Sequence, residues 1–518
     1  MGKRRLIWKR LIGTLAVGIG AWLFVAPGFA AAQNEWLTWG YDQERTGWNR
    51  SESVLNKDNV SQLQLKWKVQ LTGPQEMVLS TLTSPLVARG NGPQGARDLV
   101  YMAGSDDTIY AIDAEVGEIV WQKQFKNPVA AKDKATFQCG NSLNATPVID
   151  KQAGIIYVST SDGKLRGLSL TNGEERMPAT NFTDPYSRNW SLNLIDGVIY
   201  SSTGRGCGGA VAHFMAMDLK TRQVSEFYTS KGRPSGAWGR GGLIKGPKGI
   251  YTQTADGPYD PASGGFGNSV MSLSFKNFRL LDTYTAANWE FLNKKDLDLG
   301  SANPSVFPFQ KWTLVASASK ESTVTLLDAD KLGGSDHHTP LYLSPRWGND
   351  EFIQHNRGVW GSMATWEDKQ GRRWLLMPLW GPVSKGAPKF PVSYGSTDQG
   401  SIMAFEVLMD ANKEKPTLAP VWISRDMHAP DPPVIANGVV YVLQTGKDSD
   451  EAREKGKLGA TPKINAILYA LDAETGKELY SSGKLIESWA HFSEPVVAGG
   501  RVYVATWDGK LYAFGLKK

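Results

Sequence analysis

The sequence predicts an all-β protein, an eight-bladed β-propeller closed by an N-terminal strand in the last blade. Three observations predict this fold. Eight copies of one strand–turn pattern recur along the chain. Most copies contain four short strands, which is the make-up of a propeller blade. The last copy ends at the C-terminus after its third strand, while an unpartnered strand precedes the first copy.

The repeat is clearest at two places. Ile109–Asp113 is an apolar run that leads through a turn containing Gly117 into a second run with Trp121. Leu468–Asp472 leads through Gly476 into a further strand with the same spacing. In each turn the glycine can adopt the positive φ that a tight connection between antiparallel strands needs. The 55 glycines and 19 tryptophans of the 518-residue chain agree with repeated turns and repeated large apolar anchors.

Weaker copies of the repeat follow the first one. The positions equivalent to Asp113 are Ser169, Asp218, Ser274, Asp328, Glu406, Asp472 and Gly515. The segment Leu65–Leu71 resembles Ile119–Phe125, the fourth strand of the first copy. We therefore expect Leu65–Leu71 to be the outer strand of the last blade, where it closes the ring and covers open strand edges.

The first 32 residues are predicted to be a secretory signal peptide, which leaves residues 33–518 as a single propeller domain. Five basic residues lie within the first ten, the apolar stretch Leu11–Ala26 follows, and small residues lead to Ala32. Arg4 and Arg5 also resemble a twin-arginine export signal. A membrane anchor is the alternative, but the stretch is short and interrupted by glycine. We expect a periplasmic or secreted protein with no membrane span in its mature form.

Removal of the signal lowers the formal net charge from +6 to +1. No excess of basic residues remains that would indicate a nucleic-acid partner. The chain has two cysteines, Cys139 and Cys207, and an even number in an exported chain favours a disulfide. In neighbouring four-stranded blades, the connections that carry these two residues emerge on the same face. The motif Cys-x-x-Cys-His is absent from the sequence, so no haem is attached through it.

The segments Ala111–Trp121 and Ala470–Tyr480 resemble the tryptophan-docking repeat of quinoprotein alcohol dehydrogenases, Ala-x-Asp-x-x-Thr-Gly-x-x-x-Trp. The opening segment Trp39–Leu63 is similar to the N-terminal segment of that family, and the resemblance covers roughly residues 36–516. It implies a propeller that holds pyrroloquinoline quinone on its axis, on a calcium ion, with an aspartate as base. The resemblance is more specific for the fold than for the activity, because one fold hosts unrelated functions.

Three residues carry the chemistry that the resemblance implies. Lys320 matches the basic residue that contacts the quinone oxygens, where a cation would stabilise charge on the reduced quinone. An exposed lysine on a hairpin is the alternative. Asp256 and Asp260 are candidates for the base, and as two carboxylates four residues apart they are also candidate calcium ligands. In their Gly- and Pro-rich loop, Asx-turns are the alternative.

Tryptophans recur where the chain enters the inner strands, at Trp238, Trp360 and Trp489. A ring of indoles at the axis could stack on a flat cofactor, with Arg240 facing the same opening. Packing between blades is the alternative reading of these residues.

Two functions stay open at this point. The first is oxidation of a small alcohol- or sugar-like substrate by bound quinone, with electrons passed to a periplasmic protein or another acceptor. The second is a non-catalytic scaffold that binds a protein or glycan, as the related barrel-assembly propellers do. Lys320 and the acidic loop favour the enzyme. Leu82 and Val359 favour the scaffold, because they stand where the family is expected to have a calcium-binding glutamate and an asparagine.

Overall fold

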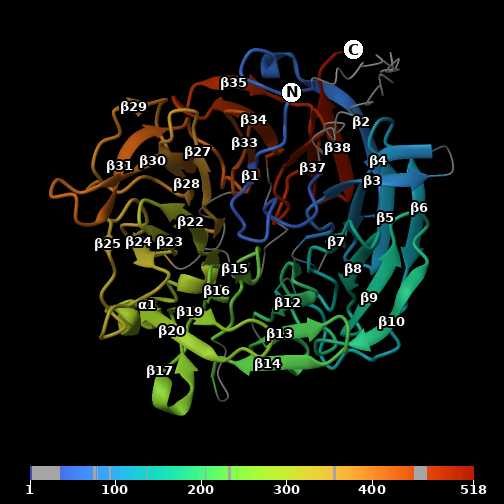
Figure 1. Ribbon diagram of the computed structural model, residues 1–518, viewed down its shortest axis with the longest axis horizontal. Helices are drawn as coiled ribbons and strands as arrows, with labels where there is room; N and C mark the ends of the chain where they lie inside the picture. Colours follow the sequence, from blue (N-terminus) through green and yellow to red (C-terminus); the bar gives the residue numbers. More distant parts are fainter. Residues whose placement is uncertain are drawn as a thin grey trace. The chain divides into compact units, whose positions relative to one another are not determined.

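The computed structural model describes residues 1–2, 35–73, 78, 80–92, 95–136, 138–204, 206–230, 235–353, 357–447 and 464–517. From residue 35 onward the chain forms eight sheets of four or five strands arranged around a common axis (Figure 1). The predicted all-β, eight-bladed propeller is therefore confirmed. Nearly all of the predicted signal peptide lies outside the described residues, so it stays a prediction.

The four main strands of each blade are antiparallel and follow chain order from the axis outward, except in blade 8, whose outermost strand comes from the N-terminal side. Blades 6 and 7 each carry one extra strand that pairs in parallel. Blade 1 contains β3 (Leu86–Gly92), β4 (Gly95–Ala103), β5 (Thr108–Asp113) and β6 (Ile119–Gln124). Blade 2 contains β7 (Val148–Asp150), β8 (Ile155–Ser159), β9 (Lys164–Ser169) and β10 (Glu175–Asn181). Blade 3 contains β11 (Asn193–Ile195), β12 (Val198–Ser202), β13 (His213–Asp218) and β14 (Val224–Tyr228), and blade 4 contains β15 (Ile244–Lys245), β16 (Ile250–Gln253), β19 (Ser269–Leu273) and β20 (Leu280–Thr285).

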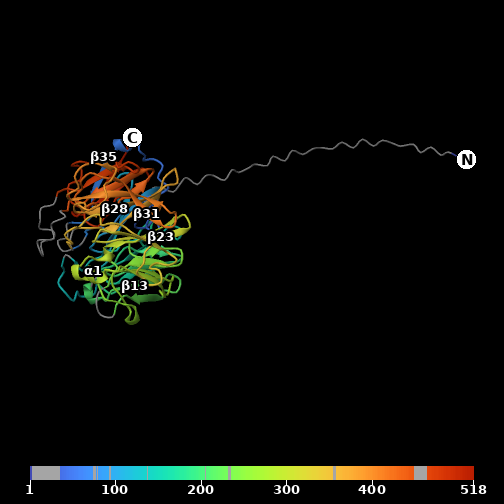
Figure 2. The same cartoon turned by 90° about the vertical axis from the view of Figure 1, so that its left-hand side faces the viewer.

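Blades 5 to 8 complete the ring, and the side view of Figure 2 shows β23, β28 and β31 facing the viewer. Blade 5 contains β22 (Ser305–Phe309), β23 (Trp312–Ala318), β24 (Val324–Asp328) and β25 (Tyr342–Leu343). Blade 6 contains β27 (Ala364–Glu367), β28 (Arg373–Trp380), β30 (Gly400–Met409), β31 (Pro416–Ile423) and the added β29 (Val392–Ser393). Blade 7 contains β32 (Val434–Ala436), β33 (Val439–Gln444), β34 (Ile467–Asp472), β35 (Glu478–Ser481) and the added β1 (Trp48–Asn49), and blade 8 contains β36 (Val496–Ala498), β37 (Arg501–Ala505), β38 (Lys510–Gly515) and β2 (Gln64–Gln70).

A few elements lie outside this pattern, most of them in the long excursions of blade 4 and its connection to blade 5. They are the hairpin β17 (Tyr259–Asp260) and β18 (Gly265–Phe266), the helix α1 (Trp289–Lys295), the parallel pair β21 (Ala302–Asn303) and β26 (Gly361–Ser362), and the short 3-10 turns η1 (Val60–Gln62), η2 (Cys207–Gly209), η3 (Pro261–Ser263) and η4 (Leu299–Ser301). Figure 1 shows the hairpin and α1 on the outer side of the ring.

The repeat residues build the turn between the third and fourth strands. The carboxylate of Asp113 accepts the backbone N–H of Glu115, and its carbonyl accepts the N–H of Gly117 at a φ of +78°. Trp121 packs on the equivalent turn of the next blade, where a Cβ on Gly173 would lie 2.7 Å from its ring. Its indole N–H donates to the carbonyl of Leu170. The turn needs glycine both for its backbone angle and for this close approach.

The ring closes as predicted. β2 pairs with β38 in an antiparallel register from Gln64 opposite Gly515 to Gln70 opposite Lys510. Figure 1 shows this blue strand beside the red C-terminal one. Trp67 on β2 packs over Gly117 of blade 1 and donates to the carbonyl of Ala114, 3.1 Å away. Blade 8 is therefore joined to blade 1 by the same tryptophan contact that joins neighbouring blades elsewhere.

The segment from Trp36 to Asn49 crosses the axis and connects almost every blade. Its buried Arg45 donates to the carbonyls of Trp39, Leu192 and Gly241. Hydrogen bonds to the blades pair Trp36 with Val87, Leu37 with Ile149, Gln43 with Asn193 and Lys245, Thr46 with Thr365, Gly47 with Ile435, and Asn49 with Val497. These contacts reach blades 1, 2, 3, 4, 6, 7 and 8, so the segment holds the ring together from within.

The predicted disulfide is present between Cys139 and Cys207, with Cα atoms 5.3 Å apart. It links the connection that enters blade 2 to the connection between β12 and β13 of blade 3. We expect replacement of both cysteines by serine to lower the free energy of unfolding by about 2–4 kcal/mol, because the unfolded chain loses a cross-link across 68 residues. Denaturant unfolding of the oxidised protein and the double variant measures the difference. Equal stability of the two proteins would contradict this expectation.

Candidate functional site

Lys320 is buried at the axial end of blade 5, in the turn between β23 and β24. Its side chain is 3% exposed, so the exposed-hairpin reading of this lysine is wrong. The ammonium donates to the Asp298 carboxylate at 2.6 Å, to the Asp296 carboxylate at 3.3 Å and to the Asp296 carbonyl at 3.1 Å. A buried ammonium needs such partners because isolated charge is costly away from water.

Two indoles flank this ammonium. The Nζ atom of Lys320 lies 5.2 Å from the ring centroids of both Trp238 and Trp360, within the range of cation–π attraction. The two rings meet edge to face at 5.1 Å, and Trp360 stacks on Trp380 at 5.1 Å and 8°. A Cβ on Gly358 would lie 2.2 Å from the Lys320 carbonyl, so the segment that carries Trp360 approaches this close only because residue 358 is glycine.

Three carboxylates gather beside Lys320. Asp256 follows β16, while Asp296 and Asp298 follow α1 in the connection to blade 5. One oxygen from each of the three lies within 4.8 Å of the others. Asp298 also accepts the backbone N–H of Asp256 at 3.0 Å. Oxygen donors at this spacing suit a hard divalent cation such as calcium.

The charges in this cluster shift one another. Burial, and then the neighbouring Asp298 and Asp296, raise the pKa of Asp256 to about 8. Burial raises the pKa of Asp296 to about 6, although Lys320 opposes the shift. For Asp298, burial is outweighed by Lys320 and the pKa is lowered. Likewise burial opposes the charge on Lys320, but the carboxylates outweigh it and its pKa is raised. At neutral pH the cluster therefore holds a charged Lys320, ionised Asp298 and Asp296, and a protonated Asp256.

Asp260 does not join this cluster. It lies in the exposed hairpin β17–β18, where its carboxylate accepts the hydroxyl of Ser263 at 2.6 Å and caps η3. The structure thus places Asp256 beside Lys320 and keeps Asp260 away from both. Sequence reasoning had not assigned Asp296 and Asp298 to the site. The Asp-Leu-Asp pattern in an insertion between two blades was the available signal.

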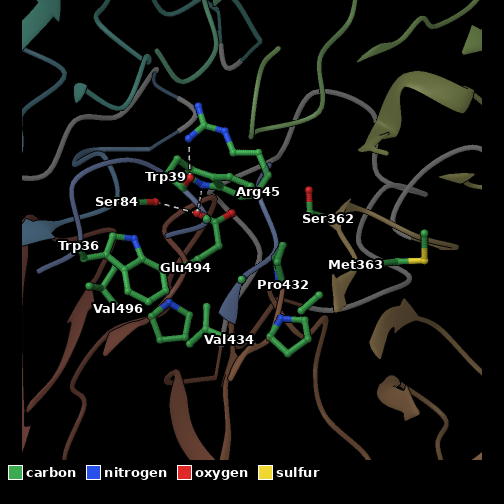
Figure 3. A pocket seen from close by; sticks show the side chains of 15 residues that line it. Trp36, Trp39, Arg45, Ser84, Ser362, Met363, Pro432, Val434, Glu494 and Val496 are labelled. Atoms are coloured by element: carbon green, nitrogen blue, oxygen red, sulfur yellow. Dashed lines mark hydrogen bonds between the residues drawn. The ribbon is translucent and has the colours of Figure 1, made fainter. Parts of the chain in front are cut away.

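Arg240 belongs to a second buried group of charges on the axis. Its Nη1 lies 2.8 Å from an oxygen of Asp431 and 2.6 Å from one of Glu494. The other oxygen of Glu494 accepts the indole N–H of Trp39 and the hydroxyl of Ser84, both at 2.6 Å (Figure 3). Burial raises the pKa of Asp431 to about 6, with Arg240 opposing the shift. Arg240 is thereby fixed by blades 7 and 8.

Two side chains beside this group carry donors that lack acceptors. Nε and Nη2 of Arg240 and the indole N–H of Trp190 are buried and have no hydrogen-bond partner among the described residues. Both side chains line one small cavity, together with Asn144, Thr146 and Ser191. A Cβ on Gly204 would contact both the Trp190 N–H and Trp238, so the cavity adjoins the Lys320 site. Unpaired donors of this kind favour a negatively charged or carbonyl-bearing occupant.

Trp489 lies in a different aromatic group. It stacks on Trp507 at 4.6 Å and contacts His491 at 5.9 Å, in the connection to blade 8. The structure therefore brings Trp238, Trp360, Lys320 and Asp256 together, with Arg240 on the neighbouring cavity.

Family models match both ends of the chain. Residues 36–185 match the model for the glucose/ethanol/alcohol dehydrogenase β-propeller domain, and residues 416–518 match the model for outer membrane protein assembly factor BamB.

Among individual proteins, the chain is 23% identical over 206 residues to quinohemoprotein alcohol dehydrogenase ADH-IIG of Pseudomonas putida, covering 38% of this chain and 26% of that protein. It is 22% identical over 235 residues to 1-butanol dehydrogenase (cytochrome c) of Thauera butanivorans, covering 45% of this chain and 30% of that protein. It is 27% identical over 141 residues to BamB of Legionella pneumophila, covering 24% and 33%. The aligned stretches thus span about a third or less of each relative.

The fold as a whole is shared with solved propellers. The quinohemoprotein alcohol dehydrogenase of Comamonas testosteroni superposes with a TM-score of 0.59 and 16% identity, over 94% of this chain and 82% of that one. A europium-containing methanol dehydrogenase superposes with a TM-score of 0.62 and 14% identity, over 93% and 98%. In the described part of this chain, no helix is both long and apolar enough to traverse a membrane.

Proposed function

Because this chain is a PQQ-type β-propeller, we propose that it is an exported oxidoreductase that oxidises an alcohol- or sugar-like substrate with bound pyrroloquinoline quinone and a divalent cation. One observation carries the proposal: Lys320, in the turn between β23 and β24, is buried between two indoles and beside three carboxylates. A lysine that serves only solubility would lie on the surface, where its ammonium keeps its hydration and the free-energy cost of burying a charge does not arise.

The residues fit the cation in their chemistry. Asp256, Asp296 and Asp298 offer carboxylate oxygens within 4.8 Å of one another, and calcium prefers such ligands. Three ionised carboxylates would carry more negative charge than the single positive charge of Lys320 balances. A bound divalent cation would balance the rest, and the raised pKa of Asp256 reflects this excess of negative charge in the cation-free protein.

The residues also fit a flat anionic quinone. Trp238 and Trp360 are only partly buried and offer ring faces beside Lys320. The unpaired donors of Arg240 and Trp190 line a cavity of about 20 Å³, which has room for one water-sized group, so we assign the quinone contact to the two indoles and Lys320. When bound, the quinone would supply a two-electron acceptor. Trp489 lies in a different aromatic cluster, and we assign it no contact with the quinone.

The chain's own residues would hold the fixed charges of the site and transfer the proton. Asp298, kept ionised by Lys320, and Asp296 hold the fixed negative charge. Asp256 is the carboxylate that we assign to accept a proton from a substrate hydroxyl. Lys320 stabilises negative charge on an oxygen that approaches its ammonium. The relatives' names support a small-molecule alcohol as substrate and a separate electron acceptor, and we place the protein in the periplasm.

The test is a titration of the purified protein with pyrroloquinoline quinone, with and without Ca²⁺, followed by absorbance and by alcohol-dependent dye reduction. We expect saturable quinone binding that Ca²⁺ strengthens. In the cation-free protein Asp256, with its pKa of about 8, should take up a proton as pH falls through about 8. Ca²⁺ should therefore bind more weakly below that pH, because the proton and the cation compete for the same carboxylate. A protein that binds no quinone at high micromolar concentration would contradict the proposal.

A second candidate is a non-catalytic periplasmic scaffold that binds a protein or glycan through its loops. The match of residues 416–518 to the BamB model favours it; these residues form β31 of blade 6 and strands β32 to β38 of blades 7 and 8. This function needs neither quinone nor cation, so the same titration separates the two candidates.

A further inference from the structure

We propose that Asn268 is a positioning residue that holds Asp256 and Asp298 together as one cation-binding pair, and that α1 anchors it through Asn293. The inference rests on the proposed function, since it concerns the same cation site. Neither asparagine belongs to the acidic cluster itself, and both lie outside the repeat.

The side chain of Asn268 is fully buried and all its polar atoms are used. Its Nδ2 donates to the Asp256 carboxylate at 3.2 Å and to Oδ1 of Asn293 at 2.7 Å. Its Oδ1 accepts the backbone N–H of Leu299, the residue after Asp298, at 2.8 Å. One amide therefore connects the loop after β16 to the connection between blades 4 and 5.

These bonds close a cycle. The backbone N–H of Asp256 donates to the Asp298 carboxylate, while the Asp256 carboxylate accepts from Asn268, which in turn accepts from Leu299. Asp256 is thus held by its backbone N–H and by its carboxylate. Asp298 is held by its carboxylate and by the hydrogen bond of the next residue, Leu299. If Asn268 is removed, one side of the cycle opens and the Asp256 carboxylate is free to rotate.

Asn293 ties the helix to the same loop. Its Nδ2 donates to the carbonyl of Gly257 at 2.7 Å, and its Oδ1 accepts the N–H of Gly257 at 3.1 Å. These two bonds to one residue fix the loop immediately after Asp256. Because α1 also leads directly into Asp296, the helix sets the spacing between the two sides of the cluster.

Position 268 requires an asparagine for two reasons. A single side chain must donate to a carboxylate and accept from a backbone N–H, which an amide does and a carboxylate or an alkyl group does not. The backbone at residue 268 has a φ of +46°, which asparagine adopts more readily than most residues. Residues that orient metal ligands in this way usually affect metal affinity about ten- to a hundredfold.

The experiment measures Tb³⁺ affinity by indole-sensitised luminescence, with Ca²⁺ as competitor. Asn268→Gly keeps the positive φ and removes only the amide, and Asn293→Ala keeps the helix and removes only the anchor. We expect Asn268→Gly to lower Tb³⁺ affinity by about ten- to a hundredfold, and Asn293→Ala to lower it less. Competing Ca²⁺ should lose affinity in the same order.

Asn193→Gly is the matched control. Asn193, on β11 of blade 3, is another fully buried asparagine, and its Nδ2 donates to the carbonyls of Gln43 and Leu243. Its replacement should lower the melting temperature while Tb³⁺ affinity stays at the wild-type value, so loss of stability alone is distinguished from loss of positioning. Wild-type affinity in both Asn268→Gly and Asn293→Ala would overturn the inference and leave the proposed function standing. Failure of wild type itself to bind Tb³⁺ would overturn the cation site and this inference together.

Discussion

Replacement of β2 by a flexible Gly-Ser segment of equal length is expected to unfold the propeller as a whole. β2 supplies the outer strand of blade 8, and without it β38 loses its hydrogen-bonded neighbour along a register of six paired residues. The contact of Trp67 with Gly117 and Ala114 of blade 1 is lost as well. We expect a loss of several kcal/mol, comparable with the entire stability of about 5–15 kcal/mol that folded domains have. Thermal unfolding followed by circular dichroism measures it.

Two point variants separate closure from ordinary packing. Trp67→Ala keeps β2 but removes the ring, and should cost about 3–5 kcal/mol. Trp422→Ala removes an equivalent tryptophan that packs over Gly476 between blades 6 and 7, away from the closure. If closure is cooperative, replacement of β2 should destabilise the protein well beyond either tryptophan variant. A melting temperature within a few degrees of wild type after loss of β2 would show that the ring is held by other contacts.

The blades were predictable because their determinants are local. Asp113 and Gly117 form their turn within five residues, and the same pattern recurs at Asp472 and Gly476. The closing strand was predictable for a related reason, since a ring of repeats that lacks one strand needs one from elsewhere. The N-terminal segment across the axis was not predicted, because its bonds go mainly to backbone groups of many blades and leave no side-chain pattern.

The site was predictable only in part. Lys320 and Asp256 were identified through resemblance, whereas Asp296 and Asp298 were not, because their role depends on how a non-repeat insertion packs against blade 5. Asp260 is four residues from Asp256 in sequence, yet the hairpin β17–β18 carries it to the surface. The number of residues between two side chains predicts their distance only within a regular helix or strand. Asp256 and Asp260 do not share such an element, so their spacing in sequence does not bring them together.

Lys320→Met should have a large effect on stability because it leaves Asp298 buried without its counter-charge. Removal of one partner of a buried ion pair costs about 3–5 kcal/mol, mainly through the charge that remains. Asp298 is 9% exposed and its pKa is held low by Lys320, so in the variant it should take up a proton at neutral pH. The destabilisation should therefore diminish as pH falls. Denaturant unfolding at several pH values measures both the loss and its pH dependence.

The double variant Lys320→Met/Asp298→Asn tests the cause. If the cost comes from the unpaired carboxylate, the double variant should be more stable than Lys320→Met alone, although it has lost two native side chains. A double variant that is less stable, by the sum of the single losses, would show that the pair contributes little to the free energy of unfolding.

Quinone binding provides an independent measurement on the same variant. If Lys320 presents its ammonium to the cofactor, its removal takes away a charge-assisted hydrogen bond worth about 1.5–3 kcal/mol, and quinone affinity should fall by about ten- to a hundredfold. Asp298→Asn keeps the ammonium and loses the carboxylate, so it should retain more quinone affinity than Lys320→Met. Equal quinone affinity in wild type and Lys320→Met would mean that this lysine only neutralises Asp296 and Asp298. The indoles of Trp238 and Trp360 would then line a structural ion pair rather than a cofactor site.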